Sequence, residues 1–354
     1  MQILILGGTG AMGSHVCRLL AKEGHSVLCT TRQYRHSENP NIQYISGNAR
    51  EKSFLDGLLV HHWDAIIDFM VWSTADFKER YQAFLAVTDQ YVFLSSYRVY
   101  ANSSVITEDS PRLLDVVDDK EYLETDEYAL SKARCENLLF ESKTNNWTIV
   151  RPAITYDGSV GRLQLAVLEA SAWLWRALNG IAVPLPEEML SKQATMTWGF
   201  DVATMIAGLT GKPQALGEAF TVATSEHKSW KEIIEIYQRR LPELQVIPCD
   251  LRAFEKARGG IYQIRYDRMF NRVVDNSKVL KVTGLSQSDL APIEKLEDEL
   301  KVFLKSANEL SFGGVGINAR LDRLVGGMPS LIPLLHVNPN LIQIAKYMAR
   351  RVVI

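Results

Sequence analysis

The sequence is poor in the residues that hold small disulfide-bonded or metal-bound proteins together. Its four cysteines show no C-x-x-C spacing and no histidine cluster beside them, which argues against a zinc site or a disulfide framework. We therefore expect no bound metal and a reduced, cytoplasmic compartment. The remaining composition, 47% hydrophobic and 23% charged, is typical of a globular protein with a sizeable core.

The chain also lacks long apolar runs and an excess of one charge. No stretch approaches the roughly 18 apolar residues of a membrane span. The first apolar run, Ile3 to Leu6, is too short for the core of a signal peptide. The formal net charge is −2 at pH 7, so no general field attracts nucleic acid or membranes. We expect a small-molecule partner, no nucleic acid and no membrane span, and leave a homodimer open.

What the first half of the chain does contain is a regular alternation of strand-like and helix-like segments. Each short apolar run is followed by residues whose apolar positions recur at helical spacing. The strand-like runs are QILIL, SVLCTT, IQYIS, DAIIDFMV, QYVFLSS and WTIVRP. Strands that alternate with helices at this pace imply right-handed crossovers and a parallel sheet covered on both faces. The sequence therefore predicts a doubly wound α/β fold of the Rossmann type.

A glycine-rich turn, GGTGAMG, follows the first strand. Glycine lets the backbone turn tightly and approach a pyrophosphate closely, and the amides of the next helix N-terminus then face the anion. A glycine string alone is weak evidence, but its place between a first strand and a first helix strengthens it; the alternative is a turn without a ligand. The predicted phosphate-binding residues are Gly7, Thr9, Gly10, Ala11, Met12 and Gly13.

The end of the second strand, CTTRQYRH, bears on the choice of dinucleotide. A site that prefers NAD usually has an acidic residue here, about 20 residues after the glycines, to bind the ribose 2′-hydroxyl. This chain has Arg32 instead, and an arginine can pair with a 2′-phosphate. We predict NADP or NAD, with NADP favoured; the alternative is that Arg32 is a solvated loop residue.

A tyrosine and a lysine four residues apart, Tyr128 and Lys132, share one face of a predicted helix. Ser95 and Ser96 end the fifth strand, at the sheet edge where ligands bind in such folds. A free tyrosine has a pKa of about 10, and a lysine ammonium beside it would stabilise the phenolate needed for proton transfer. The same residues could be a strand-end cap, a half-buried aromatic and a surface charge, so the pattern alone leaves both interpretations open.

Taken in order, these motifs resemble the extended short-chain dehydrogenase/reductase family of nucleotide-sugar epimerases, dehydratases and reductases. The resemblance covers roughly residues 1–305 and rests on the glycine turn, YVFLSSYRVY, YALSK and TIVRPAITY. It implies that Ser96, Tyr128 and Lys132 are catalytic and that Tyr128 and Lys132 also contact the cofactor. It further implies cofactor contacts for Asn48, Ala49, Phe69, Met70, Val71, Ala153 and Ile154.

The chain departs from the family at two places. Its 4,6-dehydratases carry Thr-Asp-Glu where Ser96, Tyr97 and Arg98 stand, so the acid pair for water elimination is missing. Many of its epimerases place an arginine shortly before the position of Asp201, and this chain has none there. The substrate's diphosphate contacts are therefore open, with three basic residues as candidates: Arg162, Arg176 and Lys192.

The second half of the chain is less regular and suggests three segments. We predict a dinucleotide-binding domain over residues 1–152, a segment over 153–310 that completes the sheet and forms a smaller substrate domain, and a tail over 311–354. Ser229 and Glu232 have the spacing of a capping box at a helix start. The end of the tail has apolar residues at helical spacing beside basic ones, which favours a helix docked on the enzyme or on a partner subunit. A membrane-surface role is the alternative, which more basic residues would favour.

The expected function is that of an NAD(P)-dependent epimerase or dehydratase-type oxidoreductase, which transfers a hydride at a carbon of a nucleotide sugar. The alternative is an NADPH-dependent keto-sugar reductase, because the missing acid after the second strand leans towards an exchanged cofactor. A non-catalytic dinucleotide-binding sensor or RNA-associated protein is the third hypothesis. The presence of both Tyr128 and Lys132 counts against it.

Overall fold

The chain divides into two compact units that exchange segments. The structure is a computed structural model and describes residues 1–306, 314–337 and 340–352. Unit 1 comprises Met1–Thr155, Thr195–Glu226 and Val273–Ala291, and unit 2 comprises Tyr156–Ala194, His227–Arg272 and Pro292–Ile354. The segment after residue 152 thus contributes to both units, and the predicted boundary at residue 310 lies outside the described residues.

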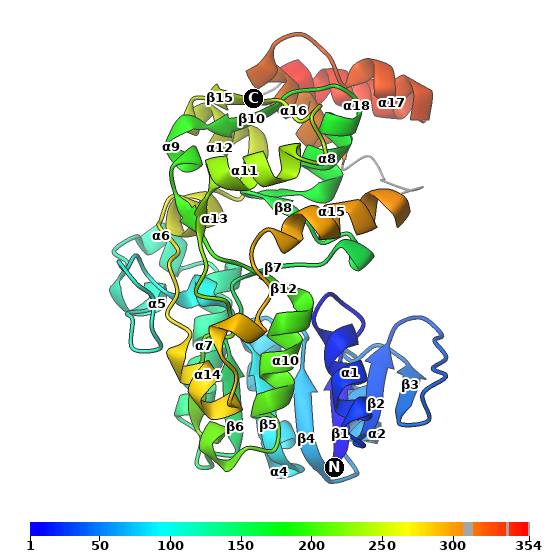
Figure 1. The fold of residues 1–354 in the computed structure, drawn as a ribbon, viewed down its shortest axis with the longest axis vertical. Helices are drawn as coiled ribbons and strands as arrows, with labels where there is room; N and C mark the ends of the chain where they lie inside the picture. Colours follow the sequence, from blue (N-terminus) through cyan, green and yellow to red (C-terminus); the bar gives the residue numbers. More distant parts are fainter. Residues whose placement is uncertain (307–313, 338–339, 353–354) are drawn as a thin grey trace. The chain divides into compact units, whose positions relative to one another are not determined.

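A seven-stranded parallel sheet forms the centre of unit 1 (Figure 1). Its order is β13-β6-β5-β4-β1-β2-β3, so the direction of winding reverses between β1 and β4. In open α/β sheets ligands bind outside the carboxyl ends of the strands at such a reversal. The predicted doubly wound α/β fold is confirmed. The strands are β1 (Gln2–Leu6), β2 (Ser26–Thr31), β3 (Ile42–Ser46), β4 (Trp63–Asp68), β5 (Thr88–Leu94), β6 (Trp147–Val150) and β13 (Glu218–Phe220).

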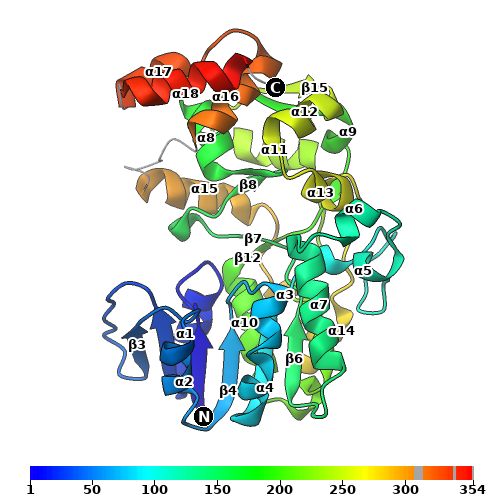
Figure 2. The same ribbon diagram turned by 180° about the vertical axis from the view of Figure 1, so that it is seen from behind.

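Helices cover both faces of this sheet, and β1 shows how the sequence specifies this. Its residues alternate between two cores: Ile3 and Ile5 pack with one, Leu4 and Leu6 with the other. Because both faces are buried, β1 is a continuous apolar run. The first core is covered by α1 (Gly13–Lys22), α10 (Gly199–Leu209) and α14 (Ser277–Thr283). The second is covered by α2 (Lys52–Leu58), α3 (Thr74–Lys78), α4 (Tyr81–Ala86) and α7 (Tyr128–Phe140), which face the reader in Figure 2.

The stretch DFKERYQAFLAVT between β4 and β5 has the apolar spacing of a single helix, yet it forms the two short helices α3 and α4. Arg80 stands between them, and its guanidinium lies 5.3 Å from the ring centroid of Trp72. The break allows Phe77 of α3 and Phe84 of α4 both to be fully buried against the sheet. The remaining elements of this half are η1 (Tyr97–Val99), α5 (Leu113–Val116), α6 (Lys120–Leu123), β7 (Ile154–Tyr156), β12 (Met196–Trp198), η3 (Pro213–Ala215) and η5 (Gln287–Asp289).

Unit 2 combines short strand pairs with helices. The predicted capping box is confirmed, because the Ser229 side chain accepts from the backbone of Glu232 at the start of α11 while the Glu232 side chain accepts in return. The elements are η2 (Gly158–Val160), β8 (Gln164–Leu165), β9 (Leu168–Glu169), α8 (Ala170–Leu178), β10 (Val183–Pro186), α9 (Glu187–Leu190), β11 (Gln193–Ala194), β14 (Lys228–Ser229), α11 (Trp230–Gln238), β15 (Val246–Cys249), α12 (Leu251–Arg258), α13 (Ile261–Gln263), η4 (Ile264–Arg268) and α15 (Lys295–Ser306).

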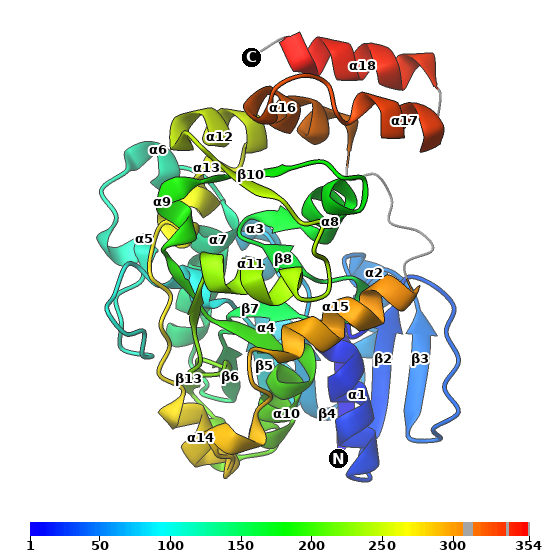
Figure 3. The same ribbon diagram turned by 45° about the horizontal axis from the view of Figure 1, so that its top comes forward.

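Three helices end the described chain and belong to unit 2. They are α16 (Val315–Val325), α17 (Leu331–Val337) and α18 (Leu341–Val352), and Figure 3 shows α18 running beside α16 and α17. The helix expected near the end of the chain therefore corresponds to α18. Residues 311–313, 338–339 and 353–354 of the predicted tail lie outside the described residues. Within the described ranges, no helix has both the length and the apolar character needed to cross a membrane.

Candidate cofactor and active site

The turn between β1 and α1 is built so that another molecule can approach its backbone. Gly7 has φ +69°, and its amide donates to the Thr30 hydroxyl at 2.9 Å. A Cβ at Gly13 would lie 2.5 Å from the Gly8 Cα, so glycine is needed where the helix start packs on the strand end. A Cβ at Gly10 would meet nothing within 4 Å, so this position faces open space. The turn therefore fits a phosphate cradle at a helix N-terminus.

A cavity of about 380 Å³ lies at the carboxyl ends of the central strands of unit 1. The predicted cofactor residues that line it are Gly7, Thr9, Arg32, Asn48, Ala49, Phe69, Met70 and Val71. They come from the turns after β1, β2, β3 and β4, which is where the sheet places the carboxyl ends of parallel strands. The predicted residues that are not among those lining it are Gly10, Ala11, Met12, Gly13, Tyr128, Lys132, Ala153 and Ile154.

Four further residues line the cavity: Thr30, Thr31, Gly47 and Arg50. Thr31, Gly47 and Arg50 each adjoin a predicted residue in the sequence and Thr30 stands two positions before Arg32, so nearness to predicted residues was the available signal. The Arg50 guanidinium donates to the Val71 carbonyl at 2.5 Å and lies 6.0 Å from the Trp72 ring centroid. Two arginines, Arg32 and Arg50, thus line the cavity, and none of the residues described around it carries a carboxylate.

The segment after β6 lies beside the glycine turn. Thr155 donates its hydroxyl to the Ala153 carbonyl at 3.4 Å and to the Met12 sulfur at 3.7 Å. Ala153 and Ile154 are both buried. The structure thus brings these two predicted cofactor residues next to the β1–α1 turn.

A buried carboxylate accepts hydrogen bonds that stabilise the turn after β4. Asp68 accepts from the Met70 amide at 2.8 Å, from the Trp72 indole at 2.7 Å and from the Tyr91 hydroxyl at 2.6 Å. Burial raises the pKa of Asp68, although these three donors act in the opposite direction. Because Phe69, Met70 and Val71 line the cavity, Asp68 fixes one of its walls.

Tyr128 and Lys132 are the first and fifth residues of α7. The Glu127 side chain caps this helix by accepting from the Ala129 amide at 2.8 Å. The Lys132 ammonium is buried and donates to the carbonyls of Leu94 at 2.6 Å and Met70 at 3.4 Å. It lies 5.9 Å from the ring centroid of Tyr128. Lys132 therefore joins the cavity wall at Met70 to the tyrosine.

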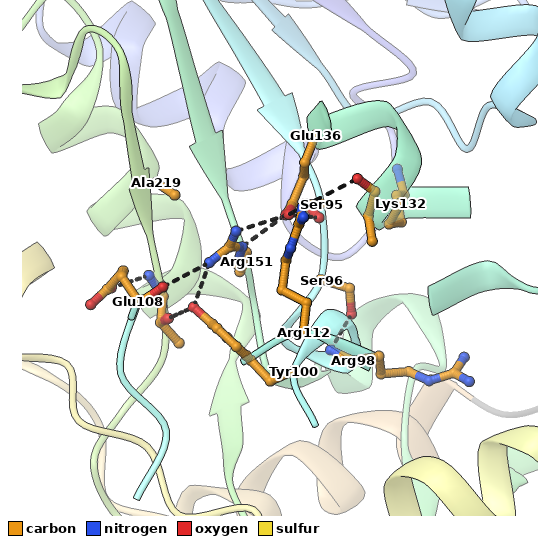
Figure 4. Close-up of polar contacts among 12 residues, drawn as sticks. Ser95, Ser96, Arg98, Tyr100, Glu108, Arg112, Lys132, Glu136, Arg151 and Ala219 are labelled. Carbon is orange, nitrogen blue, oxygen red and sulfur yellow. Dashed lines mark hydrogen bonds and ion pairs between the residues drawn. The ribbon is translucent and has the colours of Figure 1, made fainter. Parts of the chain in front are cut away.

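The two serines at the end of β5 have different surroundings. The Ser96 hydroxyl accepts from the Arg98 amide at 3.2 Å and so caps the short helix η1. The Arg98 guanidinium lies 5.3 Å from the Tyr128 ring centroid and forms an ion pair with Glu127 at 2.6 Å. Ser95 instead donates to the Glu136 carboxylate at 2.6 Å. Ser95 is thus engaged in a buried network, whereas Ser96 lies on the side of Arg98, as Figure 4 shows.

Glu136 is the centre of that network (Figure 4). It is fully buried and accepts from the Arg151 Nε and Nη2 atoms, both at 2.8 Å, and from the Arg112 guanidinium at 3.3 Å. Burial acts to lower the pKa of Arg151, but the charges of Glu136 and Tyr100 and the hydrogen bonds to both together outweigh burial and raise that pKa. Sequence reasoning did not single out this pair, although Glu136 stands one helical turn after Lys132.

The same network extends to the neighbouring strand. Arg151 also donates to the Tyr100 hydroxyl at 2.9 Å, and that hydroxyl lies 2.8 Å from the Thr221 hydroxyl. The Thr221 amide donates to the Glu108 carboxylate at 2.6 Å. These bonds tie the ends of β5, β6 and β13 together behind the candidate serine.

One candidate for a substrate diphosphate contact is excluded by its surroundings. The Arg176 side chain in unit 2 is fully buried and pairs with Asp322 at 2.8 Å. Arg162 is exposed and Lys192 is half-buried. In the described part of the chain, no group of three or more His, Cys, Asp or Glu side chains is placed to hold a metal ion, and the four cysteines are free thiols.

A parallel sheet with this strand order, a glycine cradle after β1 and a cavity at the winding reversal together define a dinucleotide-binding protein of the Rossmann class. Residues 3–156 match the NAD dependent epimerase/dehydratase family. This part of the chain is therefore similar to the family, and the matched residues contain the cavity and the Ser96, Tyr128 and Lys132 positions.

Two curated relatives show similarity in sequence. The chain is 24% identical over 297 residues to the chloroplast stem-loop binding protein of 41 kDa b of Arabidopsis thaliana, which covers 79% of this chain and 74% of that protein. It is 31% identical over 77 residues to the UDP-glucose 4-epimerase of Lactobacillus helveticus, which covers 21% of this chain and 23% of that enzyme.

Solved structures show the same fold. The epimerase Mth375 of Methanothermobacter thermautotrophicus has a TM-score of 0.66 at 16% identity and covers 86% of this chain and 92% of its own. The UDP-glucuronic acid 4-epimerase of Bacillus cereus was solved with UDP-glucuronic acid and NAD. It has a TM-score of 0.64 at 16% identity, and the match covers 86% of this chain and 99% of that enzyme.

Proposed function

We propose that the chain is an NAD(P)-dependent oxidoreductase that acts on a nucleotide-linked sugar through Ser96, Tyr128 and Lys132. The observation that carries this proposal is the position of the Lys132 ammonium. It contacts the cavity wall at Met70 and lies beside the ring of Tyr128. A surface lysine on an ordinary helix would have neither contact, because its charge would be in water.

The residues present fit a dinucleotide. The glycine cradle suits a pyrophosphate, and the cavity beside it is lined by Asn48 and Ala49, where the family resemblance places the adenine. When bound, the nicotinamide donates or accepts a hydride. Arg32 and Arg50, with no carboxylate among the lining residues, support NADP over NAD, because an arginine fork pairs with a 2′-phosphate.

The chain's own residues supply the proton transfer and its geometry. The Tyr128 hydroxyl exchanges a proton with the substrate oxygen as the adjacent carbon changes oxidation state. The Ser96 hydroxyl orients that oxygen by a hydrogen bond. The Lys132 ammonium, fixed by two backbone carbonyls, places positive charge beside the Tyr128 ring, where negative charge develops as the hydroxyl gives up its proton. Arg98 places a second cation 5.3 Å from the same ring centroid.

Among the reactions that this site could perform, we favour an epimerase-type reaction. Arg98 occupies a position where the family's 4,6-dehydratases carry an acid, and its side chain pairs with Glu127, which does not suit water elimination. The similarity to the Lactobacillus UDP-glucose 4-epimerase supports a sugar substrate. A keto-sugar reductase is the alternative, favoured by the arginine-lined cavity. We also propose a cytoplasmic location, which the free thiols support, and leave a homodimer to be tested.

An RNA-associated role is a second candidate, because the longer of the two sequence matches is to a stem-loop binding protein. Its support is the similarity alone, and the chain's formal net charge of −2 provides no general attraction for a phosphate backbone.

Incubation of the full chain with a panel of nucleotide sugars and each dinucleotide separates these functions. An epimerase yields a product of unchanged mass with no net change in nicotinamide absorbance. A reductase consumes NADPH in proportion to product. No product from any sugar, together with tight binding of a structured RNA, would replace the enzyme with the RNA-associated protein.

A further inference from the structure

The C-terminal helix α18 is anchored to unit 2 through one face. Asp322 of α16 pairs with Arg176 of α8 at 2.8 Å and accepts from the Ser330 amide at 2.9 Å. The Tyr347 hydroxyl of α18 donates to the same carboxylate at 2.5 Å. All four side chains are buried. The Arg323 guanidinium of α16 adds a hydrogen bond to the Arg350 carbonyl at 2.5 Å.

A second face of α18 exposes large apolar side chains. Leu341 is 79% exposed, Ile342 74% and Val352 75%, and Met348 is exposed as well. At 100° per residue, Leu341, Met348 and Val352 fall within an arc of about 40°, roughly 120° from the anchoring Tyr347. This apolar face is therefore directed away from the anchoring contacts with α16, and three of its side chains are at least 74% exposed.

Basic side chains border the apolar surface on the side of Ile342, because Lys346 falls about 40° beyond Ile342 around the helix and Arg350 about 80° beyond it. Lys346 and Arg350 of α18 are exposed. Across residues 314–337 and 340–352 the one acidic residue is Asp322, and it is buried in the anchor. The exposed surface of these three helices therefore combines apolar and cationic side chains without a carboxylate in the described ranges, although the whole chain has a formal net charge of −2.

We propose that α18 docks on a lipid bilayer surface that carries anionic headgroups. Its apolar face would enter the boundary between headgroups and acyl chains, with Lys346 and Arg350 at the level of the phosphates. The helix has 12 residues, about 18 Å at 1.5 Å per residue, so it lies in the surface and does not span the bilayer. The chain would then be held at a membrane surface, whichever reaction the nucleotide site performs.

Charge and apolar exposure together favour a lipid surface over other occupants. A second copy of this chain, placed symmetrically on the same face, would bring the Lys346 and Arg350 cations of both copies together without acids to balance them. A nucleic acid would satisfy the cations but would leave Leu341 and Val352 in contact with a charged phosphate backbone. An anionic bilayer satisfies both kinds of side chain.

Vesicle flotation with the full-length chain tests the proposal. The probes are phosphatidylcholine vesicles and vesicles in which about one third of the lipid is phosphatidylglycerol, a charge density at which each cation contributes about five-fold in affinity. The first variant is Leu341→Asp, which a helix N-terminus tolerates. Its control is Val60→Asp, on unit 1, because Val60 is 75% exposed and so closely matches Leu341. The second variant combines Lys346→Gln and Arg350→Gln.

We expect binding to the anionic vesicles that weakens as salt rises, with little binding to the neutral ones. The double glutamine variant should lose affinity by on the order of 20-fold to 30-fold, about five-fold for each cation. Leu341→Asp should abolish flotation and Val60→Asp should leave it unchanged, while near-ultraviolet circular dichroism and dinucleotide binding stay as in the wild type.

Three results would overturn the proposal. The first is no flotation with either vesicle, and the second is equal loss in Leu341→Asp and Val60→Asp. The third is a wild-type dimer that Leu341→Asp converts to a monomer without any effect of vesicles, which would assign the face to a second copy. RNA binding that survives Leu341→Asp, in a variant that has lost flotation, would show that RNA and lipid use different side chains. That result would support the lipid contact of Leu341.

Discussion

Replacement of Glu136 with glutamine tests whether the buried network behind the candidate serine holds unit 1 together. Glutamine keeps the shape of the side chain but removes its charge and one acceptor oxygen. Arg151 uses both carboxylate oxygens of Glu136, and Ser95 uses one of them. Arg151 is 2% exposed, so its guanidinium would remain buried after the substitution. It would then lack the carboxylate of α7 that balances its charge.

The expected cost follows from that burial. Breaking a buried, hydrogen-bonded ion pair by removing one partner costs about 3–5 kcal/mol, because a charge stays uncompensated in a low-dielectric interior. An exposed pair such as Lys52–Asp56, with side chains 80% and 55% exposed, contributes roughly 0–1 kcal/mol. We therefore predict that Glu136→Gln lowers the opening free energy of β5 and β6 by about 3–5 kcal/mol.

Native-state hydrogen exchange of the β5 and β6 amides measures this loss directly, without the assumption that two units unfold together. Glu141→Gln is the control, because Glu141 is exposed at the end of the same helix and should change these values by less than about 0.5 kcal/mol. The double variant Glu136→Gln with Arg151→Gln should recover part of the loss, because it removes the unpaired charge. A loss below about 1 kcal/mol in Glu136→Gln would refute the reasoning.

Two further predictions concern the cavity. Arg32→Asp should weaken NADP binding by about ten-fold or more and NAD binding much less, because a negative charge then faces the 2′-phosphate; Arg35→Asp is the control outside the cavity lining, and equal losses for both dinucleotides in titrations would contradict the NADP preference. Asp68 has a raised pKa through burial, so its contribution to stability is complete below the ordinary value of 3.8 and is lost as the pH rises through the raised value. Asp68→Asn should therefore gain in urea midpoint relative to the wild type between about pH 4 and pH 7, and a constant difference across that range would contradict the assignment.

The sheet and the cradle could be predicted because their signals are local. A strand buried on both faces must be a continuous apolar run, as Ile3 to Leu6 is, and the turn after it must be glycine where a Cβ would strike Gly8. The family resemblance assigned residues at strand ends, such as Asn48 and Met70, to the cofactor, and they line one cavity because parallel strands carry all their carboxyl ends to one edge. Each of these inferences uses only a few neighbouring positions.

What the sequence left open depends on contacts between distant segments. Glu136 and Arg151 look like surface charges until the fold places α7 against the end of β6. Arg176 looked like a candidate phosphate ligand because nothing in the sequence indicates its buried partner Asp322. The division of the helix around Arg80 likewise arises from packing on the sheet, because Phe77 and Phe84 must both reach the same core.

The exchange of segments between the two units has the same cause. Residues 195–226 return to unit 1, where α10 packs beside α1 and β13 pairs with β6. Composition changes after residue 152 but does not reveal which elements return. A single boundary read from the sequence therefore could not describe units built from several segments each.

The most direct test of the proposed chemistry is the turnover of Tyr128→Phe on whichever nucleotide sugar the panel identifies, with the dinucleotide dissociation constant measured on the same protein. Phenylalanine keeps the ring beside Arg98 and Lys132 and removes the one hydroxyl that would transfer the proton. We predict that kcat falls by roughly 10²–10⁴, the range general acid–base catalysis contributes, while dinucleotide binding and the activity of a Tyr81→Phe control stay close to the wild type. A Tyr128→Phe protein with full turnover would contradict the assignment of Tyr128 as the proton-transfer residue.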